Sequence, residues 1–174
     1  MTALRIGIVG SRFAAHLHLL AYRRVYGVDV RLAGVTSPTA ARRKAFADES
    51  GATPYPDLAA MLPHVDVVDI CSPPATHEPA ALEAIDAGKH VLIEKPFTGA
   101  FGSPAGKEAL LQEALASSDR MVDAARRRGI VPRFPERRAD HRRSAAARAR
   151  TFFDVLNEHA SAATRRTVAT LALR

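Results

Sequence analysis

The stretch Leu4-Arg5-Ile6-Gly7-Ile8-Val9-Gly10-Ser11-Arg12-Phe13-Ala14-Ala15 decides the fold. Its first half, Leu4–Val9, is a short apolar run that stops at Gly10, which is typical of a buried strand entering a tight turn. A helix is predicted directly afterwards, over residues 14–26, where apolar residues recur near a 3.6-residue period: Leu17, Leu20, Ala21 and Val25. The stretch therefore predicts a strand, a turn and a helix in immediate succession.

The same turn is a partial match to the dinucleotide-binding pattern G-x-G-x-x-G/A. The first position makes the turn, the second lets the backbone approach a pyrophosphate, and the third must be small for helix–strand packing. Gly10 and Ala15 fit the first and third positions, whereas Arg12 replaces the second glycine. A plain strand–turn–helix remains the alternative. The cofactor-binding residues expected here are Gly10, Ser11, Arg12, Phe13, Ala14 and Ala15.

The pattern repeats along the chain. Further strands are predicted over Val30–Thr36 and residues 65–70 and 90–94, and further helices over residues 39–50, 57–62, 78–87 and 107–128. The strands are short and mostly apolar rather than alternating, which favours a parallel sheet covered on both faces. We therefore expect an α/β, doubly wound Rossmann domain over residues 1–130, with ligands at the carboxyl ends of its strands.

The positive charge is confined to the end of the chain. The net charge is +7, but residues 1–125 hold 12 Lys and Arg against 14 Asp and Glu, and residues 126–174 hold 13 Arg against 4 Asp and Glu. Such asymmetry indicates a tail rather than a property of the main domain. Residues 131–174 are predicted to be an irregular, Arg- and Ala-rich basic tail, disordered or partly helical.

Several classes of protein are excluded by composition. No apolar run is long enough to span a membrane, and the first residues lack the apolar stretch of a secretory signal. The single cysteine, Cys71, rules out an internal disulfide and a cysteine-rich zinc site, so no metal is expected and the expected location is the cytoplasm.

The end of the second strand bears on the choice of nicotinamide cofactor. An acidic residue there would bind the ribose 2′-hydroxyl of NAD. The chain has Thr36 and Ser37 instead, with Arg42 and Arg43 about one helical turn on, a set suited to the 2′-phosphate of NADP. A solvated basic helix start explains the arginines equally well, so the preference for NADP is slight.

Two further motifs follow strands. Cys71-Ser72-Pro73-Pro74-Ala75-Thr76-His77 lies at the expected ligand edge, with Thr76 as a candidate N-cap. Cys71, Ser72, Pro73 and His77 are candidate cofactor contacts, although His77 has a structural or solvent-facing role as its equal alternative. Cys71 fits a small buried residue better than a nucleophile, because no partner base is identifiable.

The second of these motifs is Glu94-Lys95-Pro96, after the strand expected at residues 90–94. An ammonium at this edge can polarise a carbonyl or stabilise an alkoxide during hydride transfer, so Lys95 is the candidate catalytic residue. Pro96 would fix the local backbone. A surface Lys-Pro turn is the alternative.

Taken together, three motifs resemble the Gfo/Idh/MocA oxidoreductases, the relatives of glucose–fructose oxidoreductase and inositol 2-dehydrogenase. These are residues 5–10, residues 69–74 with Thr76-His77, and residues 87–96. The resemblance covers roughly residues 4–130 and implies NAD(P)-dependent hydride transfer on a sugar, cyclitol or related compound. It also implies that Glu94, Lys95 and Pro96 form the family signature at the nicotinamide.

The sequence departs from that family after Gly129. Members continue with a large domain that supplies the substrate wall and further catalytic groups, and nothing here resembles it. We therefore expect a truncated or frameshifted member that is inactive alone, unless a second domain or chain completes the site for a small-molecule substrate. The alternative is a non-catalytic nucleotide-binding or regulatory module whose basic tail contacts nucleic acid, although that tail lacks interleaved aromatic residues.

Overall fold

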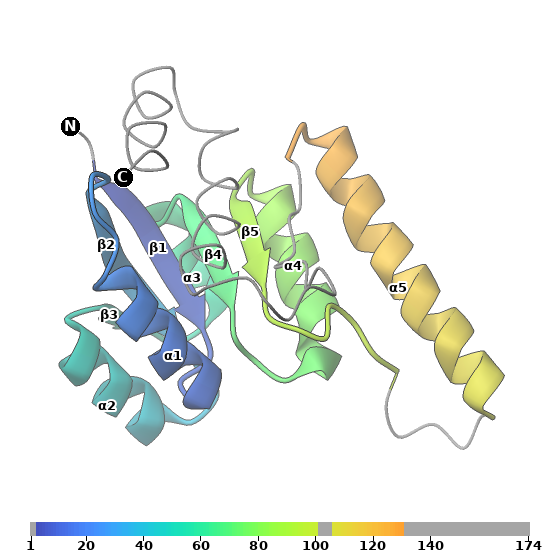
Figure 1. Cartoon of the computed structure of the whole chain (residues 1–174), viewed down its shortest axis with the longest axis horizontal. Helices are drawn as coiled ribbons and strands as arrows, with labels where there is room; N and C mark the ends of the chain where they lie inside the picture. The colour runs from blue at the N-terminus through green and yellow to red at the C-terminus, as the bar shows by residue number, and fades with distance from the viewer. Residues whose placement is uncertain (1–2, 101–105, 131–174) are drawn as a thin grey trace, which may run out of the picture.

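Five parallel strands form one sheet in the order β3-β2-β1-β4-β5 in the computed structural model, which describes residues 3–100 and 106–130 (Figure 1). The strands are β1 Leu4–Val9, β2 Val30–Thr36, β3 Thr53–Tyr55, β4 Val67–Ile70 and β5 His90–Ile93. This order confirms the expected doubly wound parallel sheet. The basic tail at residues 131–174 lies outside the described residues.

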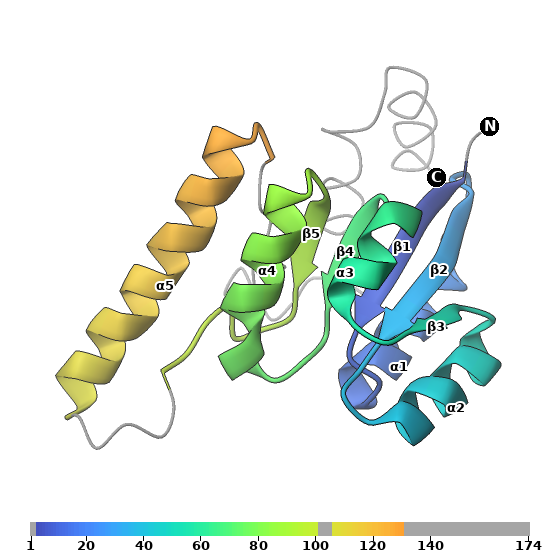
Figure 2. The same ribbon diagram turned by 180° about the vertical axis from the view of Figure 1, so that it is seen from behind.

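Helices cover both faces of the sheet (Figures 1 and 2). One face carries α1 Phe13–Tyr22 and α2 Ala40–Ser50. The other carries α3 Leu58–Met61, the short 3-10 turn η1 Leu62–His64, α4 His77–Asp86 and α5 Lys107–Arg127. A second 3-10 turn, η2 Pro74–Thr76, leads into α4. Two separate apolar cores result, one between the sheet and each helical layer.

Side chains alternate between these two cores along β1 and β4, as the pleat requires. In β1, Ile6 and Ile8 belong to the core under α1 and α2, whereas Val9 packs into the core under α3, α4 and α5. In β4, Val67 belongs to the first core and Val68 to the second. In these two strands the parity of a residue therefore fixes which helices it meets.

Close packing of α3 requires glycine on two neighbouring strands. Gly7 and Gly34 are register partners in β1 and β2. A Cβ atom on Gly7 would lie 2.9 Å from Met61 Sδ, and one on Gly34 would lie 2.8 Å from Met61 Cγ. Met61 is fully buried against this flat glycine surface, so α3 approaches the sheet more closely than larger residues would allow.

The predicted apolar face of the first helix is wrong. Leu17 and Leu20 are 53% and 49% exposed, and the helix ends at Tyr22 rather than at residue 26. Its buried residues are Ala15, Leu19 and Tyr22. The buried face is thus rotated away from the larger leucines, and small Ala15 occupies the position where α1 crosses the sheet.

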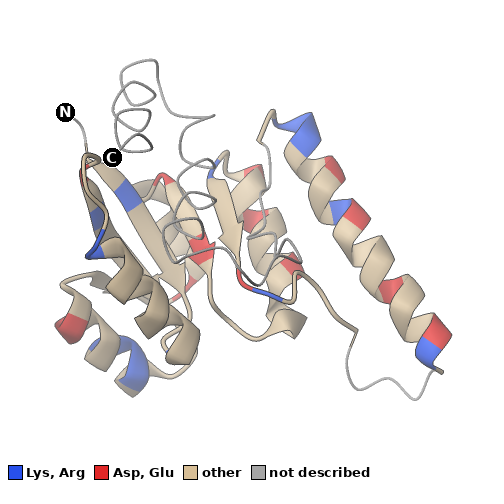
Figure 3. Ribbon diagram, viewed as in Figure 1, with Lys and Arg blue, Asp and Glu red and all other residues tan. Residues whose placement is uncertain are grey.

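Charges in the described part of the chain are mixed in sign along α2 and α5 (Figure 3). Some of these charges form surface ion pairs, including Lys44–Asp48 within α2 and Arg120–Glu78 between α5 and α4. No described helix combines the length and hydropathy needed to cross a bilayer.

Candidate functional site

The carboxyl ends of four strands meet at one edge of the sheet. The Gly10 N–H donates to the Thr36 carbonyl at 2.8 Å, and the Cys71 N–H donates to the Val9 carbonyl at 2.9 Å. The Glu94 N–H donates to the Ile70 carbonyl at 3.0 Å. The turns after β2, β1, β4 and β5 therefore form one continuous rim, which includes both Gly10 and the Glu94-Lys95-Pro96 segment.

Gly10 is required by the geometry of this rim. Its φ of +121° is a conformation that L side chains rarely adopt. A Cβ at this position would lie 2.9 Å from the Cys71 carbonyl oxygen and 3.2 Å from the Ser72 nitrogen. The turns after β1 and β4 thus approach each other at the switch point between β1 and β4, where doubly wound sheets bind ligands.

The amino end of α1 projects from the same turn. Arg12 is its N-cap, with extended backbone (φ −113°), and no side chain caps the helix. Because no side chain in the described part of the chain accepts from the first-turn N–H groups, these groups can receive an anion. Arg12 has a negative φ, so its backbone does not require glycine at the second motif position. Phe13 is 83% exposed, and Ala15 is fully buried as the third motif position requires.

The end of β2 is held to the first turn through hydroxyl groups. Ser11 Oγ donates to Ser37 Oγ at 2.8 Å, and both residues are buried, as is Thr36. Arg43 donates from Nη1 to the Ser37 carbonyl at 2.6 Å. Arg42 is exposed and forms no hydrogen bond or ion pair within residues 3–100 and 106–130. Of the two arginines, Arg42 is thus the one free for a ligand.

His77 joins the turns after β4 and β5. It is 1% exposed, with Nε2 2.7 Å from the Ser72 carbonyl oxygen and Nδ1 3.2 Å from that of Phe97. Thr76 occupies the N-cap position of α4, but its hydroxyl donates to Pro73 rather than capping the helix. His77 therefore holds the backbone of the two turns together through these carbonyl groups. Its role as a direct cofactor contact stays a prediction.

Lys95 lies exposed at the end of β5, beside a carboxylate that holds its backbone. The Lys95 N–H donates to Glu94 Oε2 at 2.9 Å, and the Lys95–Pro96 peptide bond is cis. Among the described residues the Lys95 ammonium has no ion-pair partner. An uncommitted cation is thus available at the rim.

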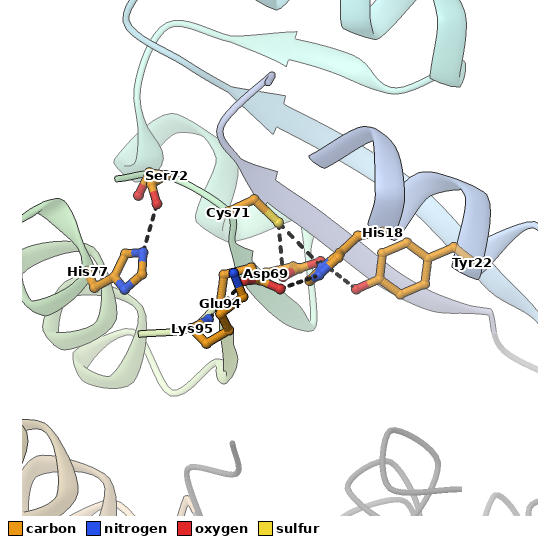
Figure 4. A network of polar contacts seen from close by, with 8 residues as sticks. All are labelled: His18, Tyr22, Asp69, Cys71, Ser72, His77, Glu94 and Lys95. Atoms are coloured by element: carbon orange, nitrogen blue, oxygen red, sulfur yellow. Dashed lines mark hydrogen bonds and ion pairs between the residues drawn. The ribbon is translucent and has the colours of Figure 1, made fainter. Parts of the chain in front are cut away.

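Beneath Lys95, a buried polar cluster was not predicted from the sequence (Figure 4). His18 of α1 places Nδ1 2.8 Å from Asp69 Oδ2 and Nε2 3.2 Å from Glu94 Oε1. Tyr22 donates from its hydroxyl to Asp69 Oδ2 at 2.7 Å. Cys71 Sγ lies 3.4 Å from His18 Nδ1 and 3.5 Å from Asp69 Oδ1. The imidazole thus bridges Asp69 of β4 and Glu94, which directly follows the neighbouring strand β5.

Electrostatics within the cluster favour an imidazolium and a protonated thiol. Burial lowers the pKa of His18, but hydrogen bonds and charge from Asp69 and Glu94 outweigh it and raise that pKa to about 9. Burial, and then the charge of Asp69, raise the pKa of the Cys71 thiol. The pKa of Tyr22 is raised for the same reasons. Although Cys71, His18 and Glu94 resemble a nucleophile, base and orienting acid, the raised thiol pKa opposes nucleophilic chemistry.

A sequence signal for this cluster exists in the strand pattern. Asp69 is a fully buried carboxylate inside the otherwise apolar β4, and a buried charge requires a partner. Asp69 shares the parity of Val67 and Cys71, both of which pack under α1 and α2. The partner should therefore lie on one of those helices, where α1 supplies His18.

A hollow of about 230 Å³ lies elsewhere, between the start of α4, the segment after β5 and α5. Its lining includes Pro74, Glu78, Thr98 and Arg120. It adjoins the rim but does not include Gly10 or Lys95, so the ligand edge is defined by the strand ends and not by this hollow.

Comparison with known proteins gives a consistent result. Residues 4–131 match the model of an oxidoreductase family with an NAD-binding Rossmann fold, GFO_IDH_MocA. The chain is 37% identical over 98 residues to UDP-N-acetylglucosamine 3-dehydrogenase of Acidithiobacillus ferrooxidans, which covers 56% of this chain and 30% of that protein. It is 31% identical over 137 residues to inositol 2-dehydrogenase 4 of Saccharopolyspora erythraea, which covers 76% and 39%.

Solved structures show the same arrangement. One solved structure of the Acidithiobacillus ferrooxidans UDP-N-acetylglucosamine 3-dehydrogenase matches with a TM-score of 0.61 and 30% identity. The match covers 77% of this chain and 38% of the dehydrogenase chain. Biliverdin reductase from Synechocystis sp., solved with biliverdin and NADP+, matches with a TM-score of 0.61 and 26% identity, over 75% and 37%. The chain spans well under half the length of these proteins. It belongs to the Gfo/Idh/MocA oxidoreductase family, and its described fold is that family's NAD-binding Rossmann domain.

Proposed function

We propose that the rim binds a nicotinamide dinucleotide and that Lys95 acts at the reacting carbon of a sugar, cyclitol or related substrate. The observation that carries the proposal is the shared edge. A backbone approach that only glycine permits, at Gly10, lies on the same rim as the Lys95 ammonium, which has no ion-pair partner among the described residues. The family match and the dinucleotides held by related structures support it.

The residues present fit a dinucleotide. The surface at Gly10 carries no Cβ, and the uncapped amino end of α1 offers N–H groups to a diphosphate. Arg12 is exposed at this turn and would add a positive charge near the phosphates. The turn after β4, Cys71 to Pro73, would lie along the cofactor, and Glu94 to Pro96 would meet its nicotinamide end.

The bound nicotinamide ring would supply or accept the hydride. Lys95 would donate a hydrogen bond to the substrate oxygen on the carbon that loses or gains that hydride, which stabilises developing negative charge. Glu94 holds the Lys95 backbone N–H, and His18 in turn holds Glu94, so this segment is positioned before ligand arrives. Because the chain covers only 30% and 39% of the two curated relatives compared above, we place the substrate wall outside the described residues.

The finer choice of cofactor rests on the end of β2. Thr36 and Ser37 end β2, in place of an acidic residue that could receive a ribose hydroxyl. Arg42 has no hydrogen-bond or ion-pair partner among the described residues, so it can bind a phosphate. We therefore infer a preference for NADP(H). Replacing Arg42 with alanine should weaken NADPH binding by about tenfold, the value of one lost charge-assisted contact, and leave NADH binding unchanged. Lys44→Ala, which removes a cation paired within α2, is the matched control.

Fluorescence titration of the full chain with NADPH and NADH tests the proposal directly. We expect saturable binding of at least one of the two dinucleotides. Gly10→Ala should abolish this binding while circular dichroism shows that the fold is retained. Absence of binding of both dinucleotides at millimolar concentration would refute the assignment. Equal loss of NADPH and NADH in Arg42→Ala would refute the cofactor preference alone.

A further inference from the structure

The cluster beneath the rim contains three different metal-ligating groups. His18, Asp69 and Cys71 come from α1, from β4 and from the residue that follows β4. One ligand atom from each lies within 4.8 Å of the others. Asp69 and Cys71 are buried, whereas the His18 side chain is 18% exposed, so His18 is the ligand nearest to solvent. From this convergence we infer a site for one divalent ion of borderline softness, Zn²⁺ being the natural choice.

The spacing of the ligand atoms fits a tetrahedral ion. Zinc bonds of about 2.0–2.1 Å to nitrogen or oxygen and about 2.3 Å to sulfur require N–S and O–S separations of about 3.6 Å. Cys71 Sγ lies 3.4 Å from His18 Nδ1 and 3.5 Å from Asp69 Oδ1. With Oδ1 as the Asp69 ligand atom, His18 Nδ1 must give up its present 2.8 Å contact with the other carboxylate oxygen, Oδ2, and turn toward the ion. Two of three edges are therefore already near their required lengths.

Groups behind the ligands complete the arrangement. A ligating histidine usually donates its other ring N–H to a carboxylate, and ligating carboxylates are themselves hydrogen-bonded. Glu94 Oε1 lies 3.2 Å from His18 Nε2, the nitrogen that points away from Cys71. The Tyr22 hydroxyl donates to Asp69 Oδ2 at 2.7 Å. Glu94 and Tyr22 thus hold the imidazole and the carboxylate in the orientation that a metal needs.

Charge balance allows a divalent ion. The Cys71 thiolate, which is the form of the thiol that binds a metal, and the Asp69 carboxylate would together neutralise an ion with two positive charges. Nitrogen, sulfur and oxygen donors together favour Zn²⁺ over Mg²⁺ or Ca²⁺, which prefer oxygen alone. Three protein ligands leave one position for water on the side of His18. The ion would join α1 to the carboxyl end of β4 whether or not a dinucleotide is bound.

Cobalt(II) titration of the full metal-free chain tests the inference, since cobalt reports its ligands by absorption. Cys71 is the only cysteine of the sequence, so a sulfur-to-cobalt charge-transfer band can arise only from this residue. We expect such a band to saturate at one cobalt per chain, to disappear when Zn²⁺ is added, and to be absent in Cys71→Ser. The band should persist in His64→Gln, which removes an exposed histidine outside the cluster.

A second variant examines the supporting group. Glu94→Gln should leave the band in place but weaken cobalt binding by about 10- to 100-fold, the usual effect of removing a hydrogen-bond partner of a ligating histidine. Circular dichroism of each variant establishes that the fold is retained. Cobalt binding without a sulfur band, a band that survives Cys71→Ser, or no binding at micromolar metal would each overturn the site. The dinucleotide titration is separate, and neither result decides the other.

Discussion

Replacing Gly10 with alanine should destabilise the domain more than any other single methyl addition at a glycine turn. Two costs combine at this position. The φ of +121° lies far from the left-handed region that L residues tolerate, which costs about 1–3 kcal/mol. The new Cβ would also sit 2.9 Å from the Cys71 carbonyl oxygen, a backbone atom that cannot rotate away, and such overpacking costs about 1–3 kcal/mol.

The sum, about 4 kcal/mol, is a large part of the roughly 5–15 kcal/mol that holds a domain of this size. Gly88→Ala is the matched control because Gly88 also has a positive φ, +70°, yet a Cβ there meets nothing within 4 Å. That change should cost only about 1–2 kcal/mol. The difference between the two variants reports the close approach of the turns after β1 and β4 together with the more unusual φ of Gly10.

Urea unfolding followed by circular dichroism measures both free energies of unfolding. The midpoint for Gly10→Ala should fall well below that for Gly88→Ala, with slopes unchanged. Equal midpoints would refute the reasoning, because they would show that the turn after β1 can move away from β4 without cost. In that event the rim would also be too pliable to hold a diphosphate by backbone contacts.

Three further outcomes follow from the same structure. Met61→Ala should cost about 2–5 kcal/mol in thermal or urea unfolding, because it leaves a cavity where the buried Met61 side chain packs over the paired glycines beside Val65 and Tyr55; a loss below about 1 kcal/mol would contradict that packing. His18→Leu should cost about 3–5 kcal/mol by leaving Asp69 buried without a cation, and adding Asp69→Leu should recover much of it in a double-mutant cycle. Arg5 hydrogen-bonds Asp66 and lowers the pKa of that carboxyl, so the pair stabilises the fold above the ordinary Asp pKa of about 3.9 and loses this effect as the pH falls further. Asp66→Asn should therefore reduce the dependence of the free energy of unfolding on pH below that value. An unchanged pH dependence in this acidic range would argue against the ion pair.

Much of the fold could be read from the sequence because its strands are short, apolar and punctuated by glycine. The ranges of β1 and β2 were predicted to the residue, and α5 to within one. The missed strand, β3, is three residues long and contains Pro54. Proline removes a ladder donor, so it argues against a strand unless that strand lies at the edge, as β3 does next to β2. Edge position is a property of the sheet order, which no local pattern reveals.

The rim was partly predictable for a related reason. Parallel strands place their carboxyl ends at one edge, so Gly10, Ser72 and Lys95 had to share it once the sheet was assigned. Which side chains remain free there is a matter of three-dimensional contacts. Ser37 is hydrogen-bonded to Ser11, and His77 is hydrogen-bonded to backbone carbonyls. Arg42 and Lys95 have no ion-pair partner in the described structure.

The wrong face of α1 and the overlooked cluster have a common cause. The face was chosen by hydrophobicity alone, which selects Leu17 and Leu20, but the sheet beneath α1 carries a buried carboxylate at Asp69. A helix that packs there must present a hydrogen-bonding group among its buried residues, and His18 can do so only if Ala15 and Tyr22, three before and four after it, also turn inward. The buried Asp69 carboxylate of β4 needs a hydrogen-bond partner, and this requirement sets the rotation of α1. Leu17 and Leu20 are exposed as a result. A buried charge on a strand is therefore better evidence for the orientation of the covering helix than that helix's own apolar residues.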